Sequence, residues 1–69
     1  MFNNYQVEKF VADLGLSYEW IEGSTSTIVV ENVIEFKPFS CWVTDLRTGQ
    51  KYHATSKFRE LCQELARSK

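Results

Sequence analysis

The sequence predicts an α+β domain of two layers, with one helix near each end of the chain and an antiparallel sheet of three to four strands between them. Apolar residues recur at helical spacing near both termini, and the segments between them alternate apolar and polar residues. Glycines and one proline separate these segments. Each helix has one apolar stripe and therefore packs once, so we expect both helices to cover the same face of the sheet.

The first helix is predicted over residues 4–14. Asn3 and Asn4 can cap its start, because their side chains accept hydrogen bonds from free backbone N–H groups. Gly15 follows as a left-handed C-terminal stop. The apolar stripe, spaced by three, one and three residues, consists of Val7, Phe10, Val11 and Leu14.

Two stretches of alternating residues follow the helix. Residues 17–23 alternate and then reach a turn signal at Gly23-Ser24. Residues 25–37 carry apolar side chains mostly at even positions. They form either one long strand with an irregularity at Glu31-Asn32 or two strands joined there by a tight turn. We favour one long, bulged strand, because the apolar parity continues across Asn32.

A hairpin is predicted after Pro38, which interrupts the ladder of strand hydrogen bonds. Residues 39–46 resume a strand, and residues 47–49 form a three-residue loop with glycine in the left-handed position. This loop places Asp45 opposite Lys51 as a cross-strand charge pair. The same register gathers one set of side chains on the core side: Trp42, Leu46, Tyr52 and Ala54.

The second helix follows the hairpin, with Thr55 or Ser56 as its predicted cap. Arg67 and Lys69 lie at its end, where the helix dipole favours cations. Its apolar stripe consists of Phe58, Leu61, Cys62 and Leu65. The predicted core contains Val7, Phe10, Val11, Leu14, Trp20, Ile28, Val30, Ile34, Phe36, Trp42, Leu46, Phe58, Leu61 and Leu65.

Length and composition limit the class of protein. Sixty-nine residues permit one domain, residues 1–69, and 43% apolar residues with 14% aromatic residues are typical of a globular chain. No apolar run approaches the roughly 20 residues of a membrane span, and the N-terminus lacks the order of a signal peptide. Cys41 and Cys62 are read as reduced thiols of a cytoplasmic protein, with a single disulfide as the alternative.

Charge is unevenly distributed along the chain. Residues 1–36 contain six acidic residues and one lysine, whereas residues 37–69 contain seven basic and three acidic residues. This asymmetry indicates either a basic binding surface or two halves that neutralise each other. With a net charge of −1, we favour mutual neutralisation.

Catalytic and metal-binding patterns are weak in this sequence. His53 is its only histidine, and the two cysteines lack the spacing of a zinc site. Cys41 and His53 could form a nucleophile pair on neighbouring strands, but a sheet surface offers neither a pocket nor an oxyanion hole. We therefore expect a protein that is not an enzyme and has no cofactor.

The face of the sheet that the helices leave uncovered is the strongest functional lead. An exposed apolar sheet surface often marks an interface, although valines also favour strands for local reasons. We expect a small non-catalytic protein-interaction module, acting as a regulator, inhibitor or accessory subunit, that binds a protein partner or a second copy of itself. The predicted interface residues are Val29, Val33, Phe39, Val43 and His53.

A DNA- or RNA-binding module is the alternative, using the basic C-terminal half. The order of elements is similar to that of double-stranded RNA-binding domains, and Ser56-Lys57 match the serine and lysine that open their second helix. Phe58, however, stands where that family has a further lysine, and the family's glycine-rich loop is missing. The candidate contacts are Arg47, Lys51, Lys57 and Arg59.

Overall fold

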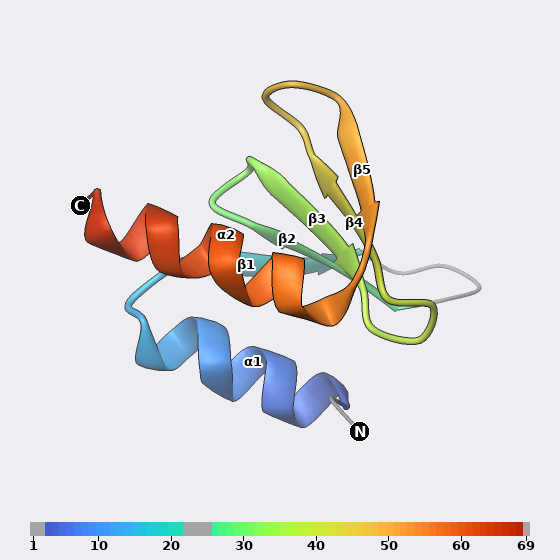
Figure 1. Cartoon of the computed structure of the whole chain (residues 1–69). Helices are drawn as coiled ribbons and strands as arrows, with labels where there is room; N and C mark the ends of the chain where they lie inside the picture. Colours follow the sequence, from blue (N-terminus) through green and yellow to red (C-terminus); the bar gives the residue numbers. More distant parts are fainter. Residues whose placement is uncertain (1–2, 22–25, 69) are drawn as a thin grey trace.

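The computed structural model describes residues 3–21 and 26–68, and in this part of the chain two helices pack on a five-stranded antiparallel sheet (Figure 1). The strands follow one another across the sheet in chain order. The α+β class is therefore confirmed, with five strands in place of the expected three to four. The elements are α1 (Asn4–Asp13), β1 (Tyr18–Ile21), β2 (Thr27–Val30), β3 (Ile34–Lys37), β4 (Trp42–Asp45), β5 (Gln50–His53) and α2 (Thr55–Arg67).

Some predicted features lie outside the described residues. These are the turn at Gly23-Ser24, the first residue of the predicted second stretch, Thr25, and the C-terminal Lys69. Within the described part, neither helix is long and apolar enough to cross a membrane.

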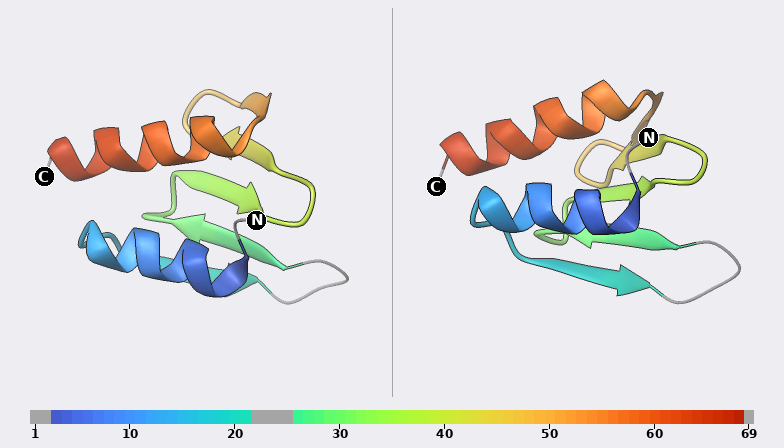
Figure 2. Two further views of the ribbon diagram at one scale, coloured as in Figure 1. Left: turned by 60° about the horizontal axis from the view of Figure 1, so that its bottom comes forward. Right: turned by 90° about the horizontal axis from the view of Figure 1, so that it is seen from below.

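The two helices lie on the same side of the sheet, which forms the second layer (Figure 2). Each strand therefore has a covered face toward the helices and an open face away from them. Two residues that lie directly opposite each other on neighbouring strands point to the same face of the sheet, and successive residues of one strand point to opposite faces. The pairs of opposite residues therefore assign each strand residue to the covered or the open face. The covered face consists of Tyr18, Trp20, Ile28, Val30, Ile34, Phe36, Val43, Asp45, Gln50 and Tyr52.

The core fills the space between the covered face and the helices. Phe36 of β3 stacks on Phe58 of α2, with ring centroids 4.1 Å apart and an interplanar angle of 12°. Phe10 of α1 meets the same Phe58 ring at 6.2 Å, so this ring contacts both the sheet and the other helix. The fully buried aliphatic side chains are Val7, Val11, Ile28, Val30, Ile34 and Val43.

Helix α1 begins and ends as its sequence predicts. Asn3 is its N-cap, and the Asn3 and Gln6 side chains each accept a hydrogen bond from the other residue's backbone N–H, which forms a capping box. Gly15 follows the helix with a left-handed φ of 75°. The indole Nε1 of Trp20 donates a 2.6 Å hydrogen bond to Glu8, which ties the helix to edge strand β1.

Helix α2 has the predicted apolar stripe but a different start. Its N-cap is Ala54, and no side chain caps the first turn, so the prediction of a Thr55 or Ser56 cap is wrong. The helix is held instead by packing, because Phe58, Leu61 and Cys62 are buried.

The prediction of one long strand over residues 25–37 is also wrong, since β2 and β3 are separate strands. The N–H of Val33 donates to the carbonyl oxygen of Val30 at 3.0 Å and closes a turn in which Glu31 and Asn32 have φ of 53° and 59°. Two consecutive positive φ values are typical of the tightest hairpin turns. The Glu31 carboxylate also accepts hydrogen bonds from the backbone N–H and hydroxyl of Ser17.

The loop between β4 and β5 has four residues, 46–49, where three were predicted. Asp45 therefore lies opposite Gln50, and the expected pairing of Asp45 with Lys51 does not form. The Asp45 carboxylate instead accepts hydrogen bonds from the backbone N–H, Nε and Nη2 of Arg47. The hydrogen bond from the Arg47 side chain lowers the pKa of Asp45, although desolvation acts against it.

The shift of one residue reverses the predicted orientation of β4. Val43, expected on the open face, is fully buried, while Trp42 and Leu46, expected in the core, are 45% and 46% exposed. Cys41, which precedes the strand, has a left-handed φ of 63° and donates its N–H to the Lys37 carbonyl oxygen at 2.7 Å. Side chains alternate between the two faces along a strand, so the backbone conformation of Cys41, just before β4, fixes which residues of the strand face the helices.

Candidate functional site

The open face is the surface of the sheet that neither helix covers. Two rows of side chains cross it, because directly paired residues lie side by side. The central row contains Glu19, Val29, Glu35, Thr44 and Lys51, in strand order from β1 to β5. Closer to the β3–β4 turn lie Ile21 paired with Thr27, and Lys37, Trp42 and His53 paired in that order.

Trp42 is the largest side chain on the open face, and it is held in place. Its ring stacks on the imidazole of His53, with centroids 4.6 Å apart and an angle of 22° between the planes. The Nε2 of His53 donates in turn to the carbonyl oxygen of Ser40 at 2.8 Å. The indole therefore presents a nearly half-exposed aromatic surface in a fixed orientation.

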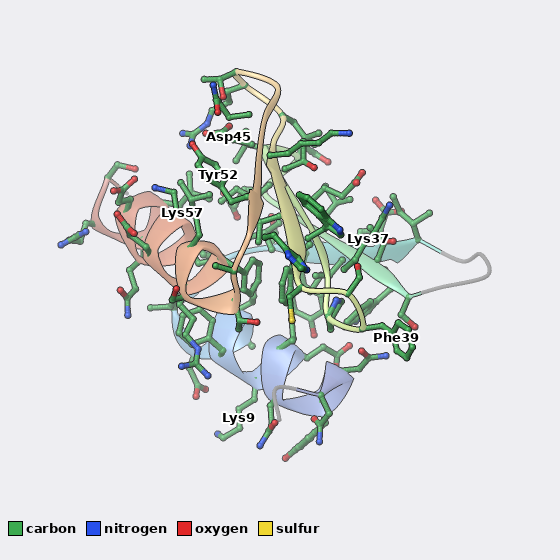
Figure 3. The ribbon with its side chains drawn as sticks, turned by 45° about the vertical axis from the view of Figure 1, so that its right-hand side comes forward. Lys9, Lys37, Phe39, Asp45, Tyr52 and Lys57 are labelled. Atoms are coloured by element: carbon green, nitrogen blue, oxygen red, sulfur yellow. The ribbon has the colours of Figure 1, made fainter. Side chains whose placement is uncertain are left out.

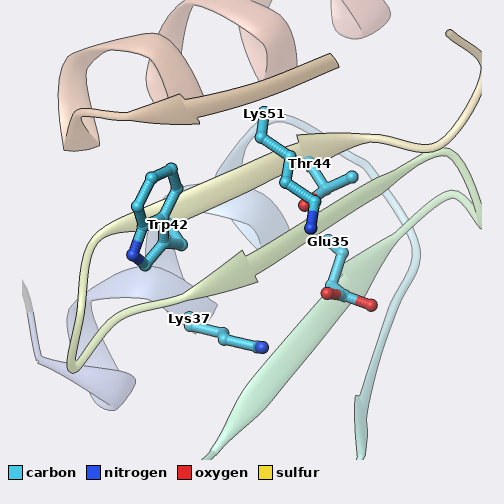
Figure 4. Close-up of a pocket in the computed structure, with 5 residues that line it drawn as sticks. All are labelled: Glu35, Lys37, Trp42, Thr44 and Lys51. Carbon is cyan, nitrogen blue, oxygen red and sulfur yellow. The ribbon is translucent and has the colours of Figure 1, made fainter. Parts of the chain in front are cut away.

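A shallow depression of about 390 Å³ lies beside the indole on the open face (Figure 4). Trp42 and Lys37 line it on the side of the β3–β4 turn. Glu35, Thr44 and Lys51, three neighbours of the central row, line the rest. An apolar ring is thus bordered by charges of both signs and by one hydroxyl group.

The predicted interface residues divide into three groups. Val29 and His53 lie on the open face, as the sequence predicts. Phe39 lies in the β3–β4 turn with 89% of its surface exposed (Figure 3). Val33 lies in the β2–β3 turn and packs against the core, and Val43 is inside the core, so their assignment to the open face is wrong.

Sequence reasoning missed Trp42, the central aromatic residue of the site. Trp42 was predicted to lie in the core because it shares a face of the predicted hairpin with Leu46 and Tyr52. That prediction assumed a three-residue loop between the two strands. The signal available in the sequence was Asp45 two residues before Arg47, because an aspartate at the start of a turn accepts hydrogen bonds from the residues that follow. Such a turn moves the hairpin register by one residue.

The four candidate nucleic-acid contacts do not converge. Lys51 is on the open face, whereas Lys57 of α2 lies on the helix side, 4.7 Å from the centroid of the Tyr52 ring (Figure 3). Arg47 is engaged by Asp45, which together with nearby Glu64 raises the pKa of the guanidinium. Arg59 is exposed on α2.

The cysteines and the histidine have separate partners. Burial raises the pKa of Cys62 to about 12, so its thiol is uncharged at neutral pH. The Cys41 thiol contacts the carbonyl oxygen of Pro38, and His53 contacts Ser40 and Trp42. Both cysteines are free thiols. Among the described residues, no three His, Cys, Asp or Glu side chains gather as metal ligands would.

Comparison of the chain with protein-family models, curated proteins and solved structures finds no match. A proposal for its function therefore depends on the open face itself: a fixed, partly exposed indole beside a shallow depression with a mixed charged border.

Proposed function

We propose that this chain is a small, non-catalytic protein-interaction domain that binds a protein through the open face, with Trp42 as the anchor. The observation that carries the proposal is the exposed, oriented indole bordered by polar side chains. Protein interfaces commonly have this organisation, in which a central aromatic residue is surrounded by a polar rim.

The stack on His53 supports the role of an anchor. A side chain that is already ordered in the free protein loses little conformational entropy on binding, so more of the contact energy contributes to affinity. Tryptophan is also among the residues most enriched at positions that dominate binding energy. Phe39 adds an exposed apolar group in the turn that leads into β4.

The chemistry of the depression is better suited to binding than to catalysis. It is shallow and bordered by Glu35, Lys37, Thr44 and Lys51, and no cysteine lines it. Its charges of both signs favour a partner with polar groups of both signs, as protein surfaces have.

A matched pair of variants tests the proposal. Trp42→Ala and Leu46→Ala remove side chains of nearly equal exposure, one from the first residue of β4 and one from the residue that follows the strand. We expect wild type and Leu46→Ala, immobilised on a resin, to retain the same protein from an extract of the source cells, and Trp42→Ala to lose it. Circular dichroism checks that both variants are folded. Equal capture by all three proteins would refute the role of Trp42.

Single-stranded nucleic acid is the second candidate ligand for the same surface. Exposed aromatic rings can stack on bases, and lysines beside them can neutralise phosphates. Trp42 lines the depression together with Lys37 and Lys51. Glu19 and Glu35 on the same face and the net charge of −1 favour a protein instead.

Titration of wild type with labelled single-stranded and duplex oligonucleotides at low salt separates the two candidates. A protein-binding domain gives a flat titration. Saturable binding that weakens with salt and with Lys51→Glu would support the nucleic-acid candidate over the protein one.

A further inference from the structure

The charges of the open face have an order that a second copy of the chain can complement. In the central row, Thr44 of β4 has Glu35 of β3 on one side and Lys51 of β5 on the other. The ion pairs of the described residues join other side chains, Lys9 to Asp13, Arg47 to Asp45 and Lys57 to Glu60. The acidic and the basic neighbour of Thr44 are therefore both available to a partner.

We propose that a second copy of this chain covers the part of the open face formed by β3, β4 and β5, related to the first by a twofold axis along β4. This inference rests on the proposed function and names the partner. A twofold axis along a strand reverses the order of the strands, so β3 of one copy lies over β5 of the other. Glu35 then faces Lys51 of the partner subunit, and the same pair forms again on the other side of the axis.

The charges select β4 as the strand on the axis. An axis along β3 opposes Glu35 to the partner subunit's Glu35 at its centre, although it also brings Glu19 over the partner subunit's Lys51. An axis along β5 opposes Lys51 to the partner subunit's Lys51. An axis along β2 places Glu19 over the partner subunit's Glu35. Like charges in contact oppose association, whereas the β4 axis places uncharged Thr44 and Trp42 at the centre.

The centre of this arrangement also buries the exposed indole. With the axis along β4, Trp42 of each copy lies near the axis and contacts the partner sheet, which removes its exposed surface from water. Aligned sheets pack about 10 Å apart, a distance that the side chains of a Glu–Lys pair can span.

The expected dimer is weak. With β4 on the axis, only β3, β4 and β5 lie opposite strands of the partner, and three strands of four residues span roughly 10 by 13 Å, much less than a standard interface of about 800 Å² per partner. We therefore expect weak association that depends on the protein concentration. Sedimentation velocity on wild type over a series of protein concentrations should show a monomer converting to a dimer, with weaker association at high salt because screening reduces the contribution of the charge pairs.

Charge reversal tests which residues face each other. Glu35→Lys and Lys51→Glu each create like-charge contacts, so each alone should raise the dissociation constant by about tenfold or more. An equimolar mixture of the two variants should associate as wild type does, because both contacts of the mixed dimer are again of opposite charge. Glu19→Lys is the control, since β1 has no strand opposite it and the variant should dimerise as wild type does.

Three outcomes overturn the inference: a wild type that stays monomeric at every concentration, a mixture of the variants that fails to associate, or a Glu19→Lys variant that loses dimerisation. An axis perpendicular to the strands would oppose Glu35 to the partner subunit's Lys37, and rescue of Glu35→Lys by Lys37→Glu in place of Lys51→Glu would show it.

The proposed function has its own readout. If wild type is monomeric but captures a protein that Trp42→Ala does not, the inference of a second copy fails while the interaction function stands. If wild type is monomeric, and if wild type, Trp42→Ala and Leu46→Ala capture the same proteins equally, both the inference of a second copy and the proposed function fail.

Discussion

The two faces of the sheet are made from alternate residues of the same strands, and they differ in almost every physical respect. On the covered face, Ile28, Val30, Ile34, Phe36 and Val43 are fully buried against the helices. On the open face, the paired positions carry Val29, Thr44, two acidic residues and two lysines around one indole. Neighbours along a strand therefore build the core on one side and the exposed surface that carries the candidate anchor on the other.

The comparison shows how much depends on turn conformation. In β4, Trp42 and Val43 are adjacent, and either could have been the buried one on grounds of hydrophobicity. The left-handed backbone of Cys41 and the Asp45–Arg47 contact set the phase, which places the valine in the core and the tryptophan outside. The position of the candidate anchor is thus decided by two turns that lie outside the open face.

The strongest test of this comparison introduces a charge at neighbouring positions of β4. Val43→Lys places an ammonium group in the core and should lower the free energy of unfolding by more than about 4 kcal/mol, much of what a domain of this length has. Thr44→Lys, on the open face, should change it by less than about 0.5 kcal/mol. Urea denaturation followed by circular dichroism at low protein concentration measures both, and equal midpoints would show that the assignment of the two faces is wrong.

Removal of one aromatic ring from each face gives a smaller contrast. Phe36→Ala loses a buried ring that stacks on Phe58, and we expect a loss of about 3–5 kcal/mol in unfolding free energy. Trp42→Ala should lose only about 1 kcal/mol, because nearly half of the indole is already exposed. A loss of comparable size in both variants in the same urea experiment would mean that Trp42 is a structural residue.

The smallest expected effect concerns the carboxylate at the edge of the covered face. Because its folded pKa is lowered, Asp45 stabilises the fold above the pKa of the unfolded state, and this contribution is lost as the pH falls through the folded pKa. Asp45→Asn should therefore reduce the free energy of unfolding at pH 7 by about 1 kcal/mol or less, which lowers the melting temperature. The difference in melting temperature between the variant and wild type should shrink in acid.

Thermal melts between neutral and acid pH measure this effect. Asp13→Asn, which removes an exposed i,i+4 partner of Lys9, is the control and should cost only a few tenths of a kcal/mol at pH 7. A difference between wild type and Asp45→Asn that is the same at all pH values would contradict the role of the Asp45 charge.

The helices, their common side of the sheet and most of the core could be predicted from the sequence, because helical periodicity survives small errors in the element boundaries. The turn at Glu31-Asn32 could not be predicted from parity. A loop of three residues between Val30 and Ile34 leaves both side chains on the same face, just as a continuous strand would. Parity therefore could not distinguish one strand from two.

The candidate site was harder to predict than the fold for a related reason. A three-residue and a four-residue loop after β4 differ by one residue, yet this difference exchanges Trp42 and Val43 between the faces. Val29 and His53 were placed correctly because the phases of β2 and β5 do not depend on that loop. Lys37 and Glu35 of β3 could be recognised as neighbours of Trp42 only when the strands were placed in register.

The order of the strands has a consequence for folding. Each strand pairs with its neighbour in the chain, so the hairpins can form from local contacts and should assemble quickly. The helices come from opposite ends of the sequence, yet Phe10 and Phe58 meet over the same sheet. A chain that lacks either helix would leave part of the covered face bare, so self-association of such fragments is the hazard that packing of both helices removes.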